Sequence, residues 1–482
     1  MKKLCELYDV DSDVLIKDIK INSKEVEKND LFICTMGVTA DRHDFIDQAI
    51  ENGASAIVVS KDIPEKSVPI IKVSNTNEEL SKLCQKFYDY PNKELTMIGV
   101  TGTDGKTSTA TIIQTLIGKD NCGYIGTNGR SWKDKVCDDN PNTTPDETRL
   151  YKFLRDFKDD GCNFAVMEAS SEAFYRKRLE NLEYDISVYT NITSEHLNIH
   201  GSFENYIDCK KNLFKRTKKV GFCILNGDDK YCGEMMSSCN GKVLTYGKNS
   251  DNDLQIVKFS VFPHKTLITW KYDNQIYDVE SPLLGDFNVY NLSAGLLATL
   301  ALGFDINDLI KNISKIKVDG RLELLDTHTP YYVMVDYAHT PNGITNLLNF
   351  VHTLDINRSI VVIGQAGERD YLKRPKVGNA VVNNASYAIF TYEDPRSEDP
   401  KDICNDIISE LKDTHDNYEI VIDRHEAIEK AIMMAKEKDM VLVLGKGNET
   451  YQKWKDGKIY FNDIEEWLRA VEKRNKKEHV NI

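Results

Sequence analysis

The chain has 482 residues, a length that predicts two to four domains rather than a single hydrophobic core. Its composition, 41% hydrophobic and 29% charged residues, is typical of a soluble globular protein and excludes a disordered one. The formal net charge of −14 argues against nucleic-acid binding, which requires stripes of Lys and Arg, but a local basic pocket for a small anion stays possible.

Short apolar runs alternate with amphipathic helical patterns along most of the chain, which favours parallel sheets covered by helices. In the first ~90 residues the pattern predicts strands at 31–36, 55–60 and 69–73, with helices near 44–52 and 77–89. The segment Tyr90-Pro-Asn-Lys-Glu then has the composition of a linker.

A second block of apolar runs follows, with strands predicted at 97–101, 123–127, 164–170, 186–192 and 222–228. A third block begins near Gly320-Arg321, with strands at 331–337, 359–364, 387–392, 418–423 and 440–445. Helices starting near Pro341, Arg374, Pro400 and Arg424 separate these last strands. This is a doubly wound pattern, whose ligands gather at the carboxyl ends of the strands.

Targeting signals and metal-binding cysteines are not evident in the sequence. No apolar run approaches the roughly 18 residues that span a bilayer, and the N-terminus lacks the apolar segment of a signal peptide. The eleven cysteines are scattered without a CxxC pair, as expected of reduced thiols. We therefore expect a cytoplasmic protein, and we interpret the run KRNKKEH near the C-terminus as a solvated helix end.

The stretch from Gly99 to Ser108, GVTGTDGKTS, predicts a phosphate-binding loop between a strand and a helix. Glycines let backbone N–H groups converge on phosphate oxygens; Lys106 is placed to contact the terminal phosphates and Thr107 a Mg²⁺ ion. Val100 stands where the usual pattern has glycine, so a simple glycine-rich turn is the alternative. Asp104 adds a negative charge to this loop. A phosphate loop alone does not identify the reaction.

Further motifs narrow the choice, and through them the chain resembles the Mur ligase family, ATP-dependent amide-forming enzymes of peptidoglycan synthesis. The likeness is strongest to the tripeptide-synthetase branch, which adds the third residue of the stem peptide. The motifs run in family order: 22–24, 29–32, 42–46, TGTDGKT at 101–107, NTTP at 142–145, MEASS at 167–171, TNITSEHLNIHG at 190–201, YIDCKKNLF at 206–214, GDFNVYN at 285–291, DGRLE at 319–323, VDYAHTPN at 335–342 and GKGNE at 445–449.

The resemblance implies an α/β fold of three domains: a small UDP-binding α/β domain at 1–91, a central P-loop ATPase-like parallel sheet at 92–319, and a Rossmann-like doubly wound domain at 320–482. It implies that a substrate carboxylate attacks the γ-phosphate of ATP and that an amine then displaces phosphate from the acyl phosphate. The implied catalytic residues are Lys106, Glu168, His196 and Lys210, and the implied cofactors are ATP and Mg²⁺.

In the family the lysine matching Lys210 carries an N-carbamate, which would turn a cation into a magnesium ligand; Lys211 is a neighbouring alternative. The implied metal ligands are Thr107, Glu168, His196 and carbamylated Lys210. The implied ATP-binding residues are Gly102, Thr103, Asp104, Gly105, Lys106, Thr107, Ser108, Asn288, Asn291, Arg321 and Asp336. Ordinary polar or capping roles are the alternative for several of them.

For a UDP-muramoyl dipeptide, the resemblance implicates Ser23, Val38, Thr39, Ala40, Asn142, Thr143, Thr144, Ser170, Arg176 and Arg178. Hydroxyls and arginines suit a diphosphate and a carboxylate. The chain departs from the family pattern here, with Glu172-Ala173 in place of His-Gly, Arg176 in place of glutamine, and Lys24 in place of arginine. Asp104 also stands where the family usually has asparagine.

For the incoming amino acid, the implied residues are Arg369, Glu393, Asp394, Pro395, Arg396, Gly445 and Glu449. The family branch that adds meso-diaminopimelate uses the arginine of D-N-P-R to bind the distal carboxylate, and Arg396 keeps that arginine in E-D-P-R. We therefore expect meso-diaminopimelate; L-lysine, another diamino acid or a paralogous acceptor are the alternatives, with a non-catalytic nucleotide-binding relative last. The expected partners are small-molecule substrates, without nucleic acid or membrane, and the chain is expected to be a monomer.

Overall fold

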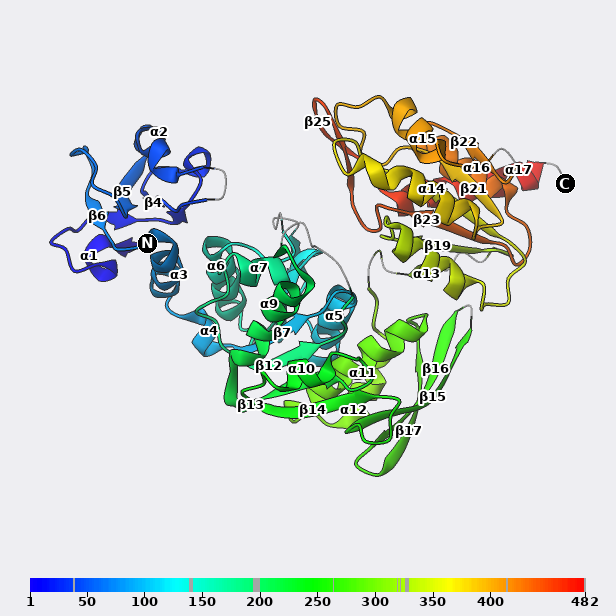
Figure 1. Ribbon diagram of the computed structural model, residues 1–482, viewed down its shortest axis with the longest axis horizontal. Coiled ribbons are helices and arrows are strands. Elements are labelled where there is room, and N and C mark those ends of the chain that lie inside the picture. Colours follow the sequence, from blue (N-terminus) through cyan, green and yellow to red (C-terminus); the bar gives the residue numbers. More distant parts are fainter. Residues whose placement is uncertain are drawn as a thin grey trace. The chain divides into compact units, whose positions relative to one another are not determined.

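The computed structural model describes residues 1–37, 40–137, 142–193, 200–262, 264–318, 320, 322–325, 329–412 and 415–480 (Figure 1). They form two compact units, each of which is described by itself. Unit 1 comprises residues 1–257, 270–277 and 290–312, and unit 2 comprises 258–269, 278–289 and 313–482. Among the described residues, no helix combines the length and the apolar character needed to span a membrane.

The N-terminal part of unit 1 contains a four-stranded parallel sheet in sequential order, β3-β4-β5-β6. Asn75 starts the helix α3, because its side chain accepts the Asn77 N–H at 3.0 Å. The elements here are β1 (Lys2–Lys3), α1 (Leu4–Leu7), β2 (Leu15–Ile16), β3 (Ile19–Lys20), η1 (Ser23–Glu25), β4 (Asp30–Ile33), η2 (Arg42–Phe45), α2 (Ile46–Glu51), β5 (Ala54–Val59), β6 (Ile70–Lys72) and α3 (Thr76–Phe87).

An eleven-stranded sheet follows, in the order β10-β9-β8-β11-β7-β12-β13-β14-β15-β16-β17. Strands β8 to β15 of that order are parallel, and β9 and β10 extend one edge as an antiparallel hairpin. Strands β15–β17 and helix α11 contribute residues to both units. The strands are β7 (Thr96–Thr101), β8 (Cys122–Gly126), β9 (Gly129–Trp132), β10 (Lys135–Cys137), β11 (Phe164–Glu168), β12 (Tyr184–Tyr189), β13 (Thr217–Asn226), β14 (Lys242–Gly247), β15 (Leu254–Phe262), β16 (Lys265–Tyr272) and β17 (Gln275–Ser281).

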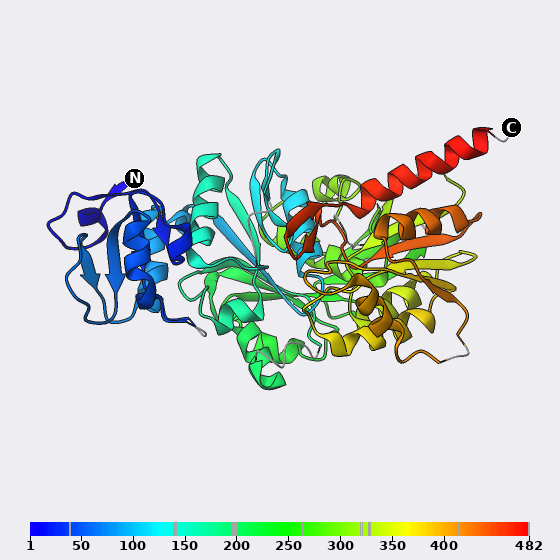
Figure 2. The same ribbon diagram turned by 90° about the horizontal axis from the view of Figure 1, so that it is seen from above.

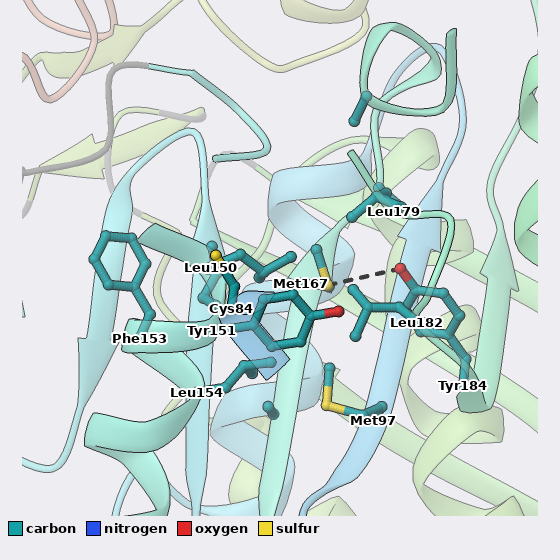
Figure 3. Close-up of a cluster of buried hydrophobic side chains, with 14 of the residues drawn as sticks. Cys84, Met97, Leu150, Tyr151, Phe153, Leu154, Met167, Leu179, Leu182 and Tyr184 are labelled. Carbon is teal, nitrogen blue, oxygen red and sulfur yellow. Dashed lines mark hydrogen bonds between the residues drawn. The ribbon is translucent and has the colours of Figure 1, made fainter. Parts of the chain in front are cut away.

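Helices pack on both faces of this sheet. Gly295 of α11 approaches α5 so closely that an added Cβ would lie 2.5 Å from Ile112 Cγ2. On the other face, Met97 of β7 and Met167 of β11 pack with Tyr151 and Leu154 of α6 in one buried cluster (Figure 3). The helices are α4 (Pro91–Glu94), α5 (Lys106–Ile117), α6 (Glu147–Asp159), α7 (Ser171–Tyr175), α9 (Phe203–Lys215), α10 (Cys232–Met236), α11 (Asp286–Ala301) and α12 (Ile306–Ile313).

Unit 2 is built on a six-stranded sheet in the order β18-β19-β23-β20-β21-β22, parallel except for β18. Successive residues of one strand pack on opposite faces: Val361 lies in the cluster with α13–α15, and Val362 in the cluster with α16 and α17. The elements are β18 (Glu323–Leu325), β19 (Tyr332–Asp336), α13 (Pro341–Val351), β20 (Ser359–Ile363), η3 (Tyr371–Lys373), α14 (Arg374–Val382), β21 (Tyr387–Phe390), α15 (Pro400–Ile408), β22 (Tyr418–Ile420), α16 (Arg424–Met434), β23 (Met440–Leu444), β24 (Tyr451–Trp454), β25 (Gly457–Tyr460) and α17 (Asp463–Val480).

The predicted α/β architecture is confirmed, and each of the three predicted domain ranges contains one of the three larger sheets. The helix predicted at the C-terminus is α17, the red helix in Figure 2. The predicted linker at Tyr90 was wrong in part, because Pro91–Glu94 forms one helical turn with proline at its first position. Strands β9, β10 and β14–β17 were not predicted, and the residue-level domain boundaries stay a prediction.

Candidate functional site

The predicted phosphate loop joins β7 to α5, and two of its glycines have a steric reason. Gly102 has φ +157° and Gly105 has φ +80°, the left-handed region that favours glycine. A Cβ on Gly102 would lie 1.8 Å from Thr190 Oγ1, and one on Gly105 would lie 2.3 Å from Asn291 Oδ1. Gly99 lies within β7 instead, where Leu213 and Tyr184 leave no room for a side chain.

Asp104 is held in this loop by its main chain. Asn191 accepts the Asp104 N–H at 3.0 Å, and the Asp104 carbonyl accepts hydrogen bonds from Thr190 Oγ1 at 2.6 Å and Asn191 Nδ2 at 3.2 Å. The side chain of Asp104 is exposed. The loop therefore uses the backbone of this residue, and its carboxylate is not part of the scaffold.

Two lysines converge on the carbonyls of the loop. Lys106 Nζ donates to Gly102 O at 3.1 Å and to Thr103 O at 2.8 Å, while Lys210 Nζ of α9 donates to Gly102 O at 2.6 Å. Lys210 is 1% exposed and its Nζ lies 4.4 Å from the centre of the Tyr206 ring. Tyr206 OH also lies 3.0 Å from Thr103 Oγ1. Burial distinguishes Lys210 from Lys211, whose ammonium pairs with Asp208 and Glu234.

Glu168 ends β11, the strand next to β7, and is fully buried. Its Oε1 accepts hydrogen bonds from Tyr124 OH at 2.7 Å and Thr127 N at 2.9 Å, and its Oε2 accepts from Thr127 Oγ1 at 3.2 Å. The register pairs Glu168 with Val100, one residue before the end of β7. Carboxyl ends of parallel strands meet at one sheet edge, so Glu168 is positioned at the edge that carries the loop.

The remaining residues predicted to bind ATP are divided between unit 1, unit 2 and the part of the chain outside the described residues. Thr107 and Ser108 are buried in the first turn of α5, and Asn291 accepts the Thr109 hydroxyl at 3.3 Å. Asn288, one turn before Asn291 on α11, and Asp336 belong to unit 2. Asp336 accepts the N–H groups of residues 322 and 338, each at 2.7 Å. His196 and Arg321 lie outside the described residues.

A cleft of about 1340 Å³ in unit 1 gathers many residues predicted to bind the UDP substrate. It is lined by Ser23, Ala40, Asn142, Arg176 and Arg178. Nine Lys or Arg residues line it against six Asp or Glu, so the cleft is locally basic in an acidic chain. Arg42, Arg130, Arg149 and Lys152 were not predicted. Val38 and Thr39 lie outside the described residues.

Thr144 connects this cleft with Glu168. Its hydroxyl donates to the Glu168 carbonyl at 2.7 Å and lies 3.1 Å from Ser170 Oγ, and its carbonyl accepts the Arg178 guanidinium at 3.1 Å. Ser170 also caps α7 through Ala173 N. Thr143 Oγ1 lies 3.1 Å from Thr127 Oγ1. The predicted residues Thr143, Thr144, Ser170 and Arg178 thus form one connected group beside Glu168.

Two departures from the family pattern contact each other. Arg176 Nε donates to Glu172 Oε1 at 2.7 Å across one turn of α7, and both side chains are partly exposed. In the same cleft, burial raises the pKa of Glu147 to about 8, against the opposing effect of its own backbone N–H. The cleft therefore holds one carboxyl that is largely protonated at neutral pH.

The predicted amino-acid site lies at the carboxyl ends of β20, β21 and β23 in unit 2. Gly445, with φ +106°, follows β23, and a Cβ there would lie 2.9 Å from Glu393 Oε2. Burial of its carboxyl raises the pKa of Glu393 to about 7, although nearby Lys446 opposes the shift. Glu449 Oε1 accepts the Tyr337 hydroxyl at 3.4 Å. Arg369 is exposed on the loop after β20.

Arg396 has φ +54°, an uncommon conformation for a residue with a side chain, and its Nε is buried without a hydrogen-bond partner. Glu398 pairs with Arg374 at 2.8 Å, and Asp399 caps α15. The alternative in which Arg396 pairs with Glu398 or Asp399 was wrong for the described residues. Its guanidinium has no ion pair in the described part of unit 2, so it stays available for an anion.

Reasoning from sequence also missed Lys446, a fully buried lysine whose Nζ lies 2.9 Å from Asp394 Oδ1 and 2.8 Å from Glu449 Oε2. Although burial opposes it, these two carboxylates raise the pKa of Lys446. Thr190, Asn191 and Tyr206 were missed as well. Thr190 and Asn191 directly follow β12, the neighbour of β7, so adjacency at the sheet edge was the signal that could have found them, whereas Tyr206 lies on α9, one turn before Lys210.

Three protein-family models match the chain: "Mur ligase family, catalytic domain" at residues 15–88, "Mur ligase middle domain" at 100–299, and "Mur ligase, glutamate ligase domain" at 320–447. Proteins named UDP-N-acetylmuramoyl-L-alanyl-D-glutamate–2,6-diaminopimelate ligase are similar over almost their whole length. The one from Bacillus velezensis is 37% identical over 477 residues, 96% of this chain and 95% of the relative. The one numbered 2 from Clostridium acetobutylicum is 36% identical over 468 residues, covering 95% and 96%.

A solved structure of a protein with the same ligase name matches with a TM-score of 0.69 at 28% identity, covering 98% of this chain and all of the other. The MurF ligase of Thermotoga maritima in complex with ADP matches with a TM-score of 0.66 at 20% identity, covering 96% of this chain and all of that one. The second likeness concerns the fold alone.

Proposed function

The chain belongs to the Mur ligase family, and on that premise we propose that it is the ATP-dependent ligase joining meso-diaminopimelate to UDP-N-acetylmuramoyl-L-alanyl-D-glutamate. The names of the relatives support the acceptor and the amine. The observation in this chain that carries the choice of amine is Arg396, whose guanidinium is buried at Nε and free of ion pairs within the described part of unit 2. A second carboxylate on the incoming amino acid would supply its missing partner.

In the first step, an oxygen of the acceptor carboxylate attacks the γ-phosphorus of ATP, and the bond from that phosphorus to the bridging oxygen of ADP breaks. The backbone N–H groups of residues 105–107, where the loop enters α5, bind the phosphates, because those of Thr103 and Asp104 are donated to Asn191. Lys106 exchanges the carbonyls of Gly102 and Thr103 for phosphate oxygens. Thr190 and Asn191 keep the loop in shape by anchoring Asp104. These residues position reactants and balance charge, which is most of what phosphoryl transfer requires.

Magnesium fits the donor set, because the Glu168 carboxylate and the Thr107 hydroxyl are hard oxygen donors and the ion otherwise takes water and phosphate oxygens. When bound, it neutralises the charge that develops on the transferred phosphoryl group. Glu168 and Thr107 would hold it, and Lys210 would join them only as a carbamate. The buried position of Lys210 beside the loop supports that role.

In the second step, the amine nitrogen, after releasing its ammonium proton to solvent, attacks the carbonyl carbon of the acyl phosphate. The carbon–oxygen bond to phosphate breaks, the nitrogen gives its second proton to the departing phosphate, and an amide forms. The basic cleft of unit 1 supports binding of the UDP-sugar peptide, with Arg178 and Thr144 on the side nearest Glu168. Glu449 is suited to the ammonium of the incoming amino acid and Arg396 to its distal carboxylate. The protein is proposed to act as a monomer.

Phosphate release from ATP in the presence of the UDP-muramoyl dipeptide tests this proposal, with meso-diaminopimelate, L-lysine and L-ornithine supplied separately and a control without amine. We expect release to depend on the amine and to be fastest with meso-diaminopimelate. Arg396→Gln should raise the KM for meso-diaminopimelate by about tenfold or more, since it removes a charge-assisted pair, and change the KM for ATP little.

Each outcome has a distinct meaning. Release that never depends on an amine would reject the ligase assignment for this acceptor and point to a paralogous acceptor, an alternative motivated by the Glu172–Arg176 pair in the cleft. Preference for L-lysine would reject the reading of Arg396 and keep the ligase.

A further inference from the structure

The amino-acid site of unit 2 contains a buried lysine that joins two of its carboxylates. Lys446 follows Gly445 at the end of β23 and is 0% exposed. Its Nζ lies 2.9 Å from Asp394 Oδ1 and 2.8 Å from Glu449 Oε2, two residues that come from different loops. A buried charge persists only when it is paired and hydrogen-bonded, so these three side chains depend on one another.

Asp394 connects Lys446 to the loop that carries Arg396. Asp394 is 3% exposed, and its Oδ1 also accepts the backbone N–H of Lys453 at 3.2 Å. Two residues further on, the Arg396 N–H donates to the Lys453 carbonyl at 2.9 Å. Both ends of the segment 394–396 are thus fixed to the strand β24, and Arg396, at the second of these ends, takes its left-handed conformation.

This arrangement leaves Asp394 poorly suited to contact a substrate. Its Oδ1 receives Lys446 Nζ and Lys453 N, its Oδ2 lies 3.9 Å from Lys453 Nζ, and almost none of the residue faces solvent. Glu449 differs, because Lys446 occupies its Oε2, whereas Oε1 has only the long 3.4 Å contact with Tyr337 among the residues that the structure describes. One oxygen of Glu449 is therefore left for an ammonium group.

We infer that Lys446 is a positioning residue for the incoming amino acid: through Asp394 it sets the backbone that presents Arg396, and through Glu449 it aims the carboxylate that receives the ammonium. Asp394, which the sequence placed among the substrate contacts, belongs to this support. Lys446 does not touch the amino acid. The inference rests on the proposed function, which supplies the substrate that Arg396 and Glu449 bind.

The test is a steady-state comparison of wild type, Lys446→Met, Asp394→Asn and the double variant, with ATP, acceptor and meso-diaminopimelate varied in turn. Lys446→Met leaves the buried Asp394 and the partly buried Glu449 without their shared cation, so the KM for the amino acid should rise by about tenfold or more. The KM for ATP should stay within about twofold, because the ATP loop belongs to unit 1. Lys438→Met, which removes a lysine paired with exposed Asp355 in the same unit, is the matched control and should change neither value.

The double variant separates positioning from general damage. Asparagine in place of Asp394 keeps an acceptor for Lys453 N and removes one of the two stranded charges, so the double variant should recover part of the KM lost in Lys446→Met. Equal changes in the KM for ATP and for the amino acid, or no change in either, would overturn the inference. If the KM for the amino acid stayed as high in the double variant as in Lys446→Met, the inference that Lys446 acts through Asp394 would be overturned.

Folding is checked by thermal unfolding of every variant. Should Lys446→Met fail to fold, Lys446→Gln, which still donates to one carboxylate, carries the same comparison. Failure of both to fold would reject positioning in favour of a purely structural role. Absence of amine-dependent phosphate release in the wild type would instead reject the proposed function, so the two failures are distinguishable.

Discussion

Glu147 gives the sharpest test of the electrostatics of the acceptor cleft. It is the first residue of α6, is 7% exposed, and has a pKa raised by burial from 4.5 to about 8. Asp146 and Glu180 add to the shift, and Arg178 and the residue's own N–H oppose it. We predict that Glu147→Gln removes a pH-dependent destabilisation of the folded protein, because glutamine has similar size and does not ionise.

The sign follows from which state holds the proton. Between pH 4.5 and 8 the unfolded chain has released it and the folded state retains it, so the free energy of unfolding falls as pH rises through this window. Over this window, each pH unit lowers the free energy of unfolding by about 1.4 kcal/mol, which gives a total loss of about 4 kcal/mol by pH 8. Below pH 4.5 the penalty is absent, and wild type and variant should then differ little.

The assay is the free energy of unfolding from urea titrations at several values of pH from 4.5 to 8.5. The stabilisation of Glu147→Gln over wild type should grow steadily with pH, while Glu51→Gln, at an exposed position of α2, should show no such growth. A difference that stays constant with pH, or a variant less stable than wild type at pH 8, would refute the reasoning and show that the Glu147 carboxyl is ionised in the fold.

Three further predictions concern the ATP loop. Lys210→Ala should lower ligase activity by about a hundredfold or more, without restoration by bicarbonate, and full activity would refute the carbamate role. Gly105→Ala should raise the KM for ATP by about tenfold, because its Cβ meets Asn291 at φ +80°; Gly118→Ala, at φ +100° with nothing within 4 Å, should cost about 1–2 kcal/mol of stability and leave that KM unchanged. Asp104→Asn should change the KM for ATP by less than about threefold, as expected of an exposed charge; a large gain would identify a repulsive carboxylate.

Much of the site could be predicted because its reactive side chains lie at or just after the ends of strands. Lys106 and Glu168 each lie at the carboxyl end of a strand or just beyond it, and a regular apolar run predicts where a buried strand stops. Sequence patterns failed for β14–β17, where most strands alternate buried and exposed residues and lack a continuous apolar run. The short helix at Pro91 failed for another reason, since a single turn is too brief to show a period.

By itself, the sequence determined the phosphate loop, the alternation of strands and helices, and the list of residues that resemble a ligase site. Local spacing suffices for these, because backbone geometry and periodicity act over a few residues. Only the tertiary structure decided that Thr190 and Asn191 anchor Asp104, that Lys210 rather than Lys211 is buried, and that Lys446 binds Asp394 and Glu449. Those facts depend on burial and on contacts between distant segments, which decide whether a charged side chain is solvated or must find a partner.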